Sequence, residues 1–306
     1  MVLVAVAALA GAWVGARRPA AKVDAVATGP GPGIVDRPVV HTIHSVPMAP
    51  EHLLSGGDLV PHVFTPRLTA EAAIVVDAGT GRVLWALNPH RHLRVASLTK
   101  IMTALLALHK LAPNDVVTVA KSVPRVPLVR EGLRAGEKVK AWKLFYSMLL
   151  YSGNDDALAL AIAAGGDKWT FVGEMNNEAH RLGLHDTHYV SPSGVVDRDN
   201  YSSAWDVAAL SRVALRNERF RTIVRTKEIQ VKWSAPTYSK IYINNNLMLR
   251  SYAGANGIKT GYTHAAGDCL AVSATRHGHT LIAVLLNAPN MYVDATRLLN
   301  FGFAAE

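Results

Sequence analysis

Apolar positions recur along this chain with two spacings, and each spacing predicts one kind of element. Apolar runs of strand length at 72–77 and 82–87 flank Ala78-Gly79-Thr80-Gly81, a sequence typical of a β-hairpin turn. Helical spacing predicts helices over 98–110, 141–151, 155–164, 168–182 and 203–216. Further strands are expected at 226–233, 268–276 and 280–287, followed by a last helix over 290–301.

This order of elements predicts an α/β (α+β) domain. Two strands, many helices and then three strands indicate an antiparallel sheet that is assembled from both ends of the domain, with helices on its faces. The proline-containing stretch 115–136 is expected to form loop and short strand.

The first quarter of the chain has a different composition. Residues 1–16 are small and apolar and precede Arg17-Arg18, which suits a signal segment better than a membrane span of about 20 residues. A basic stretch before this run is missing, so cleavage, retention as an anchor and an earlier true start all stay open. Residues 19–68 hold eight of the fifteen prolines and predict a flexible tether. We therefore divide the chain into a signal or anchor segment (1–18), a tether (19–68) and a folded domain (69–306).

Composition limits the function classes. Half of the residues are hydrophobic and 18% are charged, as in a globular protein. The single cysteine, Cys269, excludes an intrachain disulfide and is expected in the core, and no Cys/His spacing suggests a metal site or a cofactor. Net charge is +9, but the charges are interspersed, so we expect no nucleic-acid partner. Oligomeric state cannot be read from the sequence.

Three short motifs carry the candidate chemistry. Ser97-Leu98-Thr99-Lys100 opens a helical segment and is the only Ser-x-x-Lys in the chain, so the Lys100 amine can reach the Ser97 hydroxyl from the same helix face. A serine becomes a nucleophile when a neighbouring base takes its proton. Ser152-Gly153-Asn154 follows an apolar helical run, and Lys259-Thr260-Gly261 precedes a strand-like segment. Each motif also has a purely structural explanation: an N-cap serine for the first, a helix C-cap turn for the second and an ordinary strand lysine for the third.

The trio occurs in the order that penicillin-binding proteins and class A β-lactamases share, with glycine in place of aspartate in the middle motif. Several longer segments resemble the low-molecular-weight D-alanyl-D-alanine carboxypeptidases, a penicillin-binding family: 96–103, 182–184, 187–194, 201–206, 244–246 and 256–263. This resemblance covers about 70–303 and implies the β-lactamase/transpeptidase-like fold, with a mostly helical subdomain inserted into the sheet domain. No room remains after Glu306 for the C-terminal β-rich domain of some relatives, so we expect any membrane attachment at the N-terminus.

The resemblance also implies roles. Ser97 would attack the penultimate D-Ala carbonyl of a peptidoglycan stem peptide, form an acyl-enzyme and expel the terminal D-Ala, and β-lactams would acylate it covalently. Lys100 would be the base, kept neutral by burial beside a second cation. Ser152 would relay the proton. The expected substrate-binding residues are Asn154, Lys259, Thr260, Gly261 and Tyr262, and the backbone N–H groups of Ser97 and Tyr262 would form the oxyanion hole.

Two further expectations concern the outcome of the reaction. The acidic residues between the second and third motifs, Glu174, Glu178, Glu218 and Glu228, do not lie in the loop sequence that β-lactamases use for deacylation, which favours a penicillin-inhibited peptidase. A D,D-endopeptidase that cuts cross-links would share every motif, and a non-enzymatic envelope-binding relative is the other alternative. The predicted location is the bacterial cell envelope, outside the cytoplasm.

Overall fold

The computed structural model describes residues 53–56, 66–195, 198–233 and 239–306. The predicted apolar segment 1–18 and most of the predicted tether 19–68 lie outside the described residues. Residues 53–56, which the prediction assigned to the tether, pack against the domain. Leu53 and Leu54 are buried, and the backbone of Ser55 pairs with Gly81 and Val83 at the β1–β2 turn. An apolar pair therefore holds this short piece of chain on the fold.

The described chain contains strands, helices and short 3₁₀ or π-helical turns in a fixed order. The first part runs β1 (Ala72–Asp77), β2 (Val83–Leu87), η2 (Ala96–Thr99), α1 (Lys100–Lys110), β3 (Val116–Thr118), η3 (Val123–Arg125), β4 (Lys138–Lys140), α2 (Ala141–Tyr146) and the π-helical turn η4 (Ser147–Tyr151). The second part runs α3 (Asn154–Gly165), α4 (Lys168–Arg181), α5 (Ala204–Ala214), α6 (Glu218–Val224), β5 (Glu228–Lys232), β6 (Ser239–Ile243), α7 (Met248–Ser251), β7 (Ala255–Thr263), β8 (Gly267–Arg276), β9 (His279–Leu286) and α8 (Met291–Ala304).

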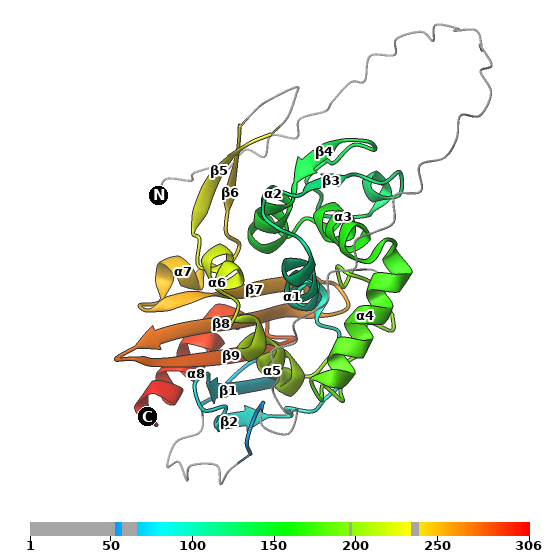
Figure 1. The fold of residues 1–306 in the computed structure, drawn as a ribbon. Helices are drawn as coiled ribbons and strands as arrows, with labels where there is room; N and C mark the ends of the chain where they lie inside the picture. Colours follow the sequence, from blue (N-terminus) through cyan, green and yellow to red (C-terminus); the bar gives the residue numbers. More distant parts are fainter. Residues whose placement is uncertain (1–52, 57–65, 196–197, 234–238) are drawn as a thin grey trace, which may run out of the picture. The chain divides into compact units, whose positions relative to one another are not determined.

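The main sheet has five antiparallel strands in the order β2-β1-β9-β8-β7 (Figure 1). Strand β1 pairs with β9 from Ala72 opposite Leu286 to Asp77 opposite Leu281, which joins the two ends of the domain. The prediction of a sheet built from both ends is thus confirmed. The strand predicted at 226–233 is present as β5, but its place in the main sheet was predicted wrongly, because β5 pairs with β6 in a separate two-stranded sheet. The fifth strand of the main sheet is β7, which contains the Lys259 motif.

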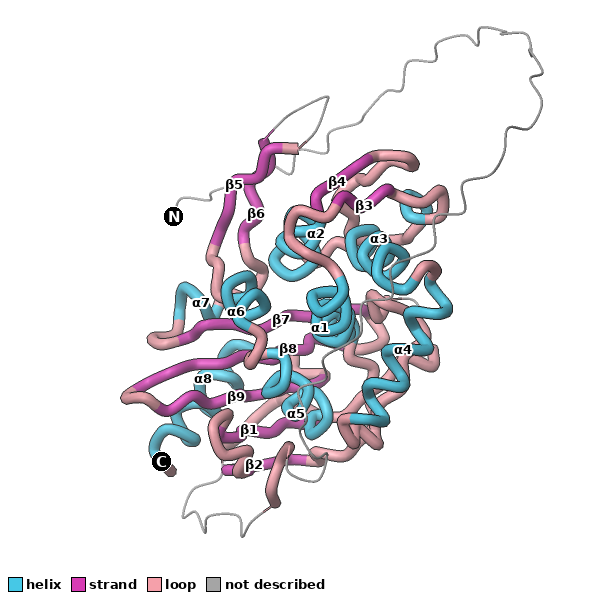
Figure 2. Tube along the Cα trace, in the orientation of Figure 1, coloured by secondary structure: helices cyan, strands magenta, loops and turns pink. Residues whose placement is uncertain are grey.

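Both faces of the sheet are buried, which explains why its strands are nearly continuous apolar runs. Alternate residues of β9 point to opposite faces. Ile282, Val284 and Leu286 belong to the core shared with α1 and α5, whereas Leu281, Ala283 and Leu285 pack on the α8 side. Figures 1 and 2 show α1, α5 and α6 in front of the sheet and α8 behind it.

A mostly helical region between β2 and β7 completes the domain, as predicted. Side chains cap several of its helices: Asp167 accepts from two backbone N–H groups at the start of α4, and Ser203 accepts from one at the start of α5. Among the described residues, none of the helices combines the length and the apolar character that crossing a bilayer requires. The turn η2, directly before α1, lies against β7, and this contact positions the candidate site.

Candidate active site

Ser97 lies in the 3₁₀ turn η2, directly before α1. The residue before it, Ala96, has φ +46°, a conformation that side-chain-bearing residues rarely adopt. Such strain persists only where the surrounding structure enforces it, and it is frequent at functional sites. The turn continues into α1, so Lys100 is the first residue of that helix, and its Nζ lies 2.7 Å from Ser97 Oγ. The predicted contact between the two side chains is present.

The amine of Lys100 is fully buried and reaches three further oxygen atoms. It lies 2.7 Å from Asn154 Oδ1, 3.5 Å from Ser152 Oγ and 3.4 Å from the Ser193 carbonyl oxygen. Burial and the charge of Lys259 lower the pKa of Lys100 well below its usual value. An amine with a depressed pKa can take a proton from a neighbouring hydroxyl at neutral pH.

Ser152 is held in place by an unusual helix end. The π-helical turn η4 ends at Ser152, whose φ of +77° puts it in the left-handed region. Its N–H and that of Gly153 both donate to the Ser147 carbonyl oxygen, at 3.0 and 3.5 Å. Asn154 then begins α3, and its Nδ2 donates to the Pro127 carbonyl oxygen at 3.0 Å. The Asn154 side chain is thus fixed between Lys100 and Pro127.

Strand β7 brings the third motif against the nucleophile. Lys259 is 1% exposed and donates to the Thr260 carbonyl oxygen at 2.9 Å, and burial lowers the pKa of its amine to about 7. A Cβ at Gly261 would lie 3.0 Å from the backbone nitrogen of Ser97 and from the Val95 carbonyl oxygen. The glycine therefore serves the close approach of β7 to the nucleophile turn.

A cavity of about 440 Å³ opens at Ser97. Six of the eight predicted site residues line it: Ser97, Ser152, Asn154, Thr260, Gly261 and Tyr262. The other two, Lys100 and Lys259, are buried and do not line it. Apolar side chains complete the wall, among them Leu128, Ile243, Leu247 and Met291, and Asp268 adds a carboxylate. The cavity therefore combines hydroxyl and amide groups near the nucleophile with apolar walls.

Two residues of this site, Ser193 and Gly194, were not predicted as site residues from the sequence. Ser193 acts through its carbonyl oxygen, which contacts Lys100. Gly194 has φ +74°, and a Cβ there would lie 2.0 Å from the Ala96 carbonyl oxygen. The only available signal was the Ser-Pro-Ser-Gly sequence at 191–194. Backbone contacts of this kind leave no side-chain chemistry to recognise.

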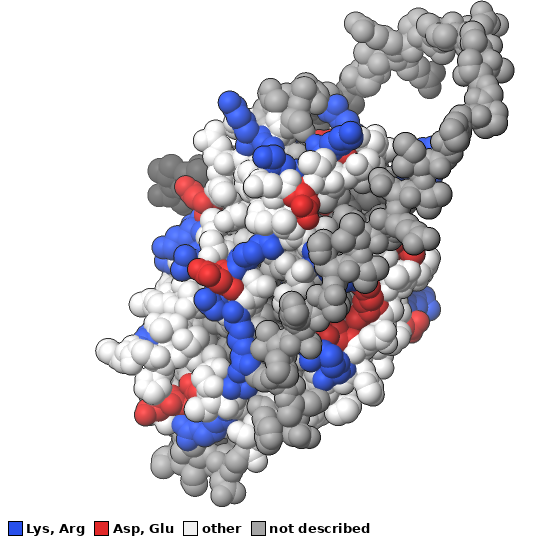
Figure 3. Space-filling view, viewed as in Figure 1, with Lys and Arg blue, Asp and Glu red and all other residues white. Residues whose placement is uncertain are grey.

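Other candidate residues lie elsewhere. Glu174 pairs with Lys110 and Glu178 with Arg181, and neither lines the cavity at Ser97. Cys269 is fully buried, as predicted, and burial raises the pKa of its thiol to about 12. Figure 3 shows Lys and Arg side chains interspersed with Asp and Glu over the described part of the face in view.

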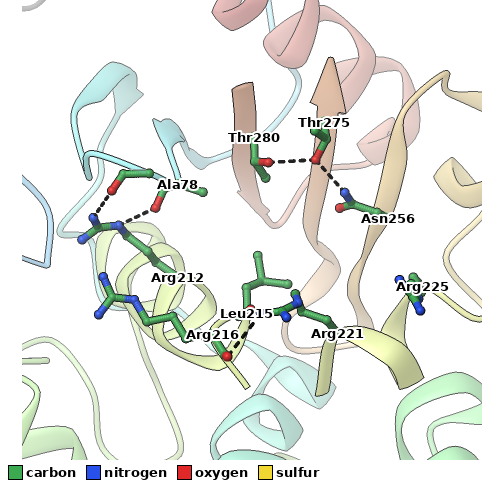
Figure 4. Close-up of a pocket in the computed structure, with 10 residues that line it drawn as sticks. Ala78, Arg212, Leu215, Arg216, Arg221, Arg225, Asn256, Thr275 and Thr280 are labelled. Atoms are coloured by element: carbon green, nitrogen blue, oxygen red, sulfur yellow. Dashed lines mark hydrogen bonds between the residues drawn. The ribbon is translucent and has the colours of Figure 1, made fainter. Parts of the chain in front are cut away.

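A second cavity of about 350 Å³ lies where α5 and α6 meet the ends of β1, β8 and β9 (Figure 4). Arginines from the two helices line it, opposite Asn256, Thr275 and Thr280. Arg212 donates to the carbonyl oxygens of Leu53, Ala78 and Gly79, and Arg221 donates to the carbonyl oxygens that follow α5. Both arginines thus satisfy backbone carbonyl groups, and Arg221 does so at the C-terminus of α5, where a cation is favourable. The cavity at Ser97 is the candidate active site.

Known proteins of one family are similar to this chain in sequence and in structure. A profile of the family described as D-alanyl-D-alanine carboxypeptidase matches residues 60–290. A D-alanyl-D-alanine carboxypeptidase of Streptomyces sp. (strain K15) is 35% identical over 261 residues, which cover 79% of this chain and 90% of that protein. A D-alanyl-D-alanine endopeptidase of Pseudomonas aeruginosa is 32% identical over 237 residues, 76% of each chain. The crystal structure of the Streptomyces K15 DD-transpeptidase is similar with a TM-score of 0.75 at 34% identity, covering 79% of this chain and 100% of that one.

Proposed function

Because the chain belongs to the D-alanyl-D-alanine carboxypeptidase family, we propose that it releases the terminal D-alanine from peptidoglycan stem peptides through an acyl-enzyme at Ser97. The family, the fold class and the serine-peptidase activity expected from the sequence are confirmed by the comparisons. The roles of individual residues are our proposal. The observation that carries it is the buried Lys100 amine, which lies within reach of both the Ser97 and the Ser152 hydroxyl groups.

The first step follows from this contact. Neutral Lys100 accepts the Ser97 proton while Ser97 Oγ bonds to the penultimate carbonyl carbon of the substrate. The negative charge on the carbonyl oxygen is stabilised by backbone N–H groups, for which we propose those of Ser97 and Tyr262. Gly261 supports this assignment because its position brings β7 next to the Ser97 backbone.

Collapse of the intermediate breaks the peptide bond. Protonated Lys100 passes its proton through the Ser152 hydroxyl to the leaving D-Ala nitrogen, and the acyl group stays on Ser97. Lys259 in its charged form and the Thr260 hydroxyl bind the substrate carboxylate, and Asn154 and Tyr262 contact the peptide. Water then attacks the ester and releases the shortened peptide, with Lys100 again the acceptor of a proton.

Covalent labelling tests the nucleophile. A fluorescent penicillin should form a stable adduct with the wild type and none with Ser97→Ala, because the amide of the β-lactam is attacked by the same hydroxyl. Ser122→Ala, at an exposed serine away from the cavity, is the matched control and should label like the wild type. Persistent labelling of Ser97→Ala would refute the assignment of the nucleophile.

The choice between carboxypeptidase and endopeptidase needs a product analysis. The Pseudomonas relative is named an endopeptidase, and such an enzyme would use the same nucleophile. Incubation with a stem pentapeptide and, separately, with a cross-linked dimer should yield free D-Ala from the first and little monomer from the second. Cleavage of the dimer alone would replace the carboxypeptidase by the endopeptidase. No product from either substrate would favour a binding protein.

The substrate also sets the location. Peptidoglycan is a polymer of the bacterial envelope, so we propose that the chain acts outside the cytoplasmic membrane, exported by its apolar N-terminal segment. Fractionation of cells that produce the full chain tests this proposal, and recovery in the cytoplasmic fraction would contradict it.

A further inference from the structure

Three buried carboxyl groups lie beside the Ser152 turn without lining the cavity. Asp155 and Asp156 are in the first turn of α3, and Glu131 is in the loop before β4. Each of the three is at most 8% exposed. An ionised carboxylate in a protein interior is costly unless neighbouring groups stabilise it. The neighbours of each group therefore decide which of them carries charge.

Asp155 and Glu131 have neighbours that stabilise the charged form. The Asp155 carboxylate accepts four backbone N–H groups, from residues 131–133 and from Asp156, at 2.7 to 3.1 Å. The Glu131 carboxylate contacts the ammonium group of Lys240, which comes from β6. Hydrogen bonds and an opposite charge both favour an ionised carboxylate.

The neighbours of Asp156 favour its protonated form instead, as its contact with Ser147 shows. The Ser147 hydroxyl lies between two carboxyl oxygens, 3.2 Å from Glu131 Oε2 and 2.5 Å from Asp156 Oδ2. A hydroxyl has a single proton to donate. It can donate to only one of the two carboxyl groups, so the other contact is a hydrogen bond only if that carboxyl group is itself protonated. Since Glu131 is paired with Lys240, the proton belongs on Asp156, which donates to Ser147, and Ser147 donates to Glu131.

We propose that the Ser147–Glu131 pair holds Asp156 in its protonated form at neutral pH, and that this neutral acid keeps Lys100 a free base. The inference rests on the proposed role of Lys100. Asp156 touches no reacting atom and is therefore a positioning residue.

The electrostatics of the cluster agree with the hydrogen-bond count. Burial and the adjacent Asp155 charge raise the pKa of Asp156 well above its usual value. The titratable groups around it are Asp155 on its own helix, Glu131 with Lys240, Lys100 on α1 and, beyond Lys100, Lys259 on β7. An ionised Asp156 would favour the ammonium form of Lys100, as Asp155 does, and would raise its pKa. A proton on Asp156 leaves only one carboxylate to oppose the effect of Lys259.

The same carboxyl group accounts for the glycine in the middle of the second motif. A Cβ on Gly153 would lie 1.9 Å from Asp156 Oδ2, so the carboxyl group occupies the space of a side chain there. Ser147, the hydrogen-bond partner of Asp156, also binds the backbone N–H of Ser152 through its carbonyl oxygen. The protonation of Asp156 and the position of Ser152 thus depend on one residue.

The pH dependence of acylation tests the proposal. In Glu131→Gln, Ser147 is free to donate to Asp156, which can then ionise and stabilise protonated Lys100. The acid limb of the pH profile is the range in which the rate of acylation by a fluorescent penicillin rises as Lys100 loses its proton. This limb should shift to higher pH by about one unit, so the rate at a given pH on the limb should fall about tenfold. Asp156→Asn should keep the wild-type limb because an amide replaces a neutral acid of the same shape. The double variant Glu131→Gln/Asp156→Asn should return to the wild-type limb. An unshifted limb in Glu131→Gln, or a shift that persists in the double variant, would overturn the proposal.

A second measurement does not depend on activity or on variants at Glu131. The infrared difference spectrum between the wild type and Asp156→Asn at neutral pH should contain the C=O band of a protonated carboxylic acid. Its absence, with a carboxylate band in its place, would overturn the proposal even if the Ser97 chemistry is correct. Conversely, a wild type that penicillin does not acylate would refute the proposed function, while the infrared band would still report on Asp156.

Discussion

Replacement of Lys259 by methionine should stabilise the fold while it slows acylation by penicillin. Lys259 is 1% exposed, and its described hydrogen bond goes to the Thr260 carbonyl oxygen. Burial lowers the pKa of its amine from 10.5 to about 7. The folded state therefore releases the Lys259 proton at a lower pH than the unfolded chain does. Methionine has a similar length, fills the same space and carries no charge to bury.

The sign and size of the effect follow from proton linkage. Between pH 7 and 10 the unfolded chain binds a proton on Lys259 that the folded state does not, so wild-type stability rises with pH in this interval. Each pKa unit corresponds to about 1.4 kcal/mol, so the advantage of Lys259→Met should grow by about 4 kcal/mol from pH 10 down to pH 7 and stay constant below that. The lost hydrogen bond subtracts about 1 kcal/mol at every pH. Removal of the Lys259 charge also makes Lys100 easier to protonate in the folded state, which further increases the stability advantage of the variant at low pH.

Urea unfolding at several pH values between 6 and 10 measures this difference. Lys121→Met, at an exposed lysine on the surface, is the matched control and should show no comparable trend. A difference between Lys259→Met and the wild type that does not change with pH would show that the folded protein does not destabilise the Lys259 ammonium. Acylation by penicillin should fall in the same variant, because both the carboxylate ligand and the cation beside Lys100 are lost.

Three further substitutions test the close approach at Gly194, the N-cap of α5 and the role of Ser152. Gly194→Ala should lower the free energy of unfolding by about 3 kcal/mol, because a Cβ there meets the Ala96 carbonyl oxygen at 2.0 Å; Gly166→Ala, with φ +84° and open space around it, should cost only about 1 kcal/mol. Equal costs would contradict the close approach. Ser203→Ala removes the N-cap of α5 and should cost about 1 kcal/mol in urea unfolding, whereas no loss would mean that water replaces the cap. Ser152→Ala should slow acylation about 10²- to 10⁴-fold in stopped-flow labelling, and an unchanged rate would exclude a proton relay through this hydroxyl.

The parts of the site that could be predicted are those with reactive side chains in short motifs. Ser97 and Lys100 are three residues apart at the start of a helix, so local geometry alone brings them together. The Ser193 carbonyl oxygen and Gly194 could not be found in this way, because they act through the backbone. Their position depends on tertiary contacts with η2 and α1. Asn200 Nδ2 donates to Thr99 Oγ1 in η2 at 2.9 Å, and Thr103 Oγ1 in α1 donates to the Pro192 carbonyl oxygen at 2.7 Å.

Strand β7 shows a second limit of sequence patterns. Asn256, Gly257, Lys259 and Gly261 interrupt its apolar pattern, so no strand of this extent was predicted at the third motif. The segment is nevertheless a strand from Ala255 to Thr263, because nearly every residue pairs with β8. Two of these residues belong to the proposed site: Lys259 is buried there, and Gly261 permits the close approach of β7 to Ser97. Tertiary pairing and function outweigh local propensity here.

The buried charges beside the cavity form a balanced set, and this balance links substrate binding to the nucleophile. With Lys100 and Asp156 neutral and Lys259 protonated, Lys259 and Asp155 leave one positive and one negative charge near the Lys100 amine. Transfer of the Ser97 proton to Lys100 then creates a second cation near Lys259, which opposes the reaction in the empty site. A substrate carboxylate bound by Lys259 offsets that charge and makes Lys100 a better proton acceptor at the moment when the scissile carbonyl is in place. We therefore expect the carboxylate of a D-Ala-D-Ala peptide or a penicillin to promote the proton transfer as well as binding.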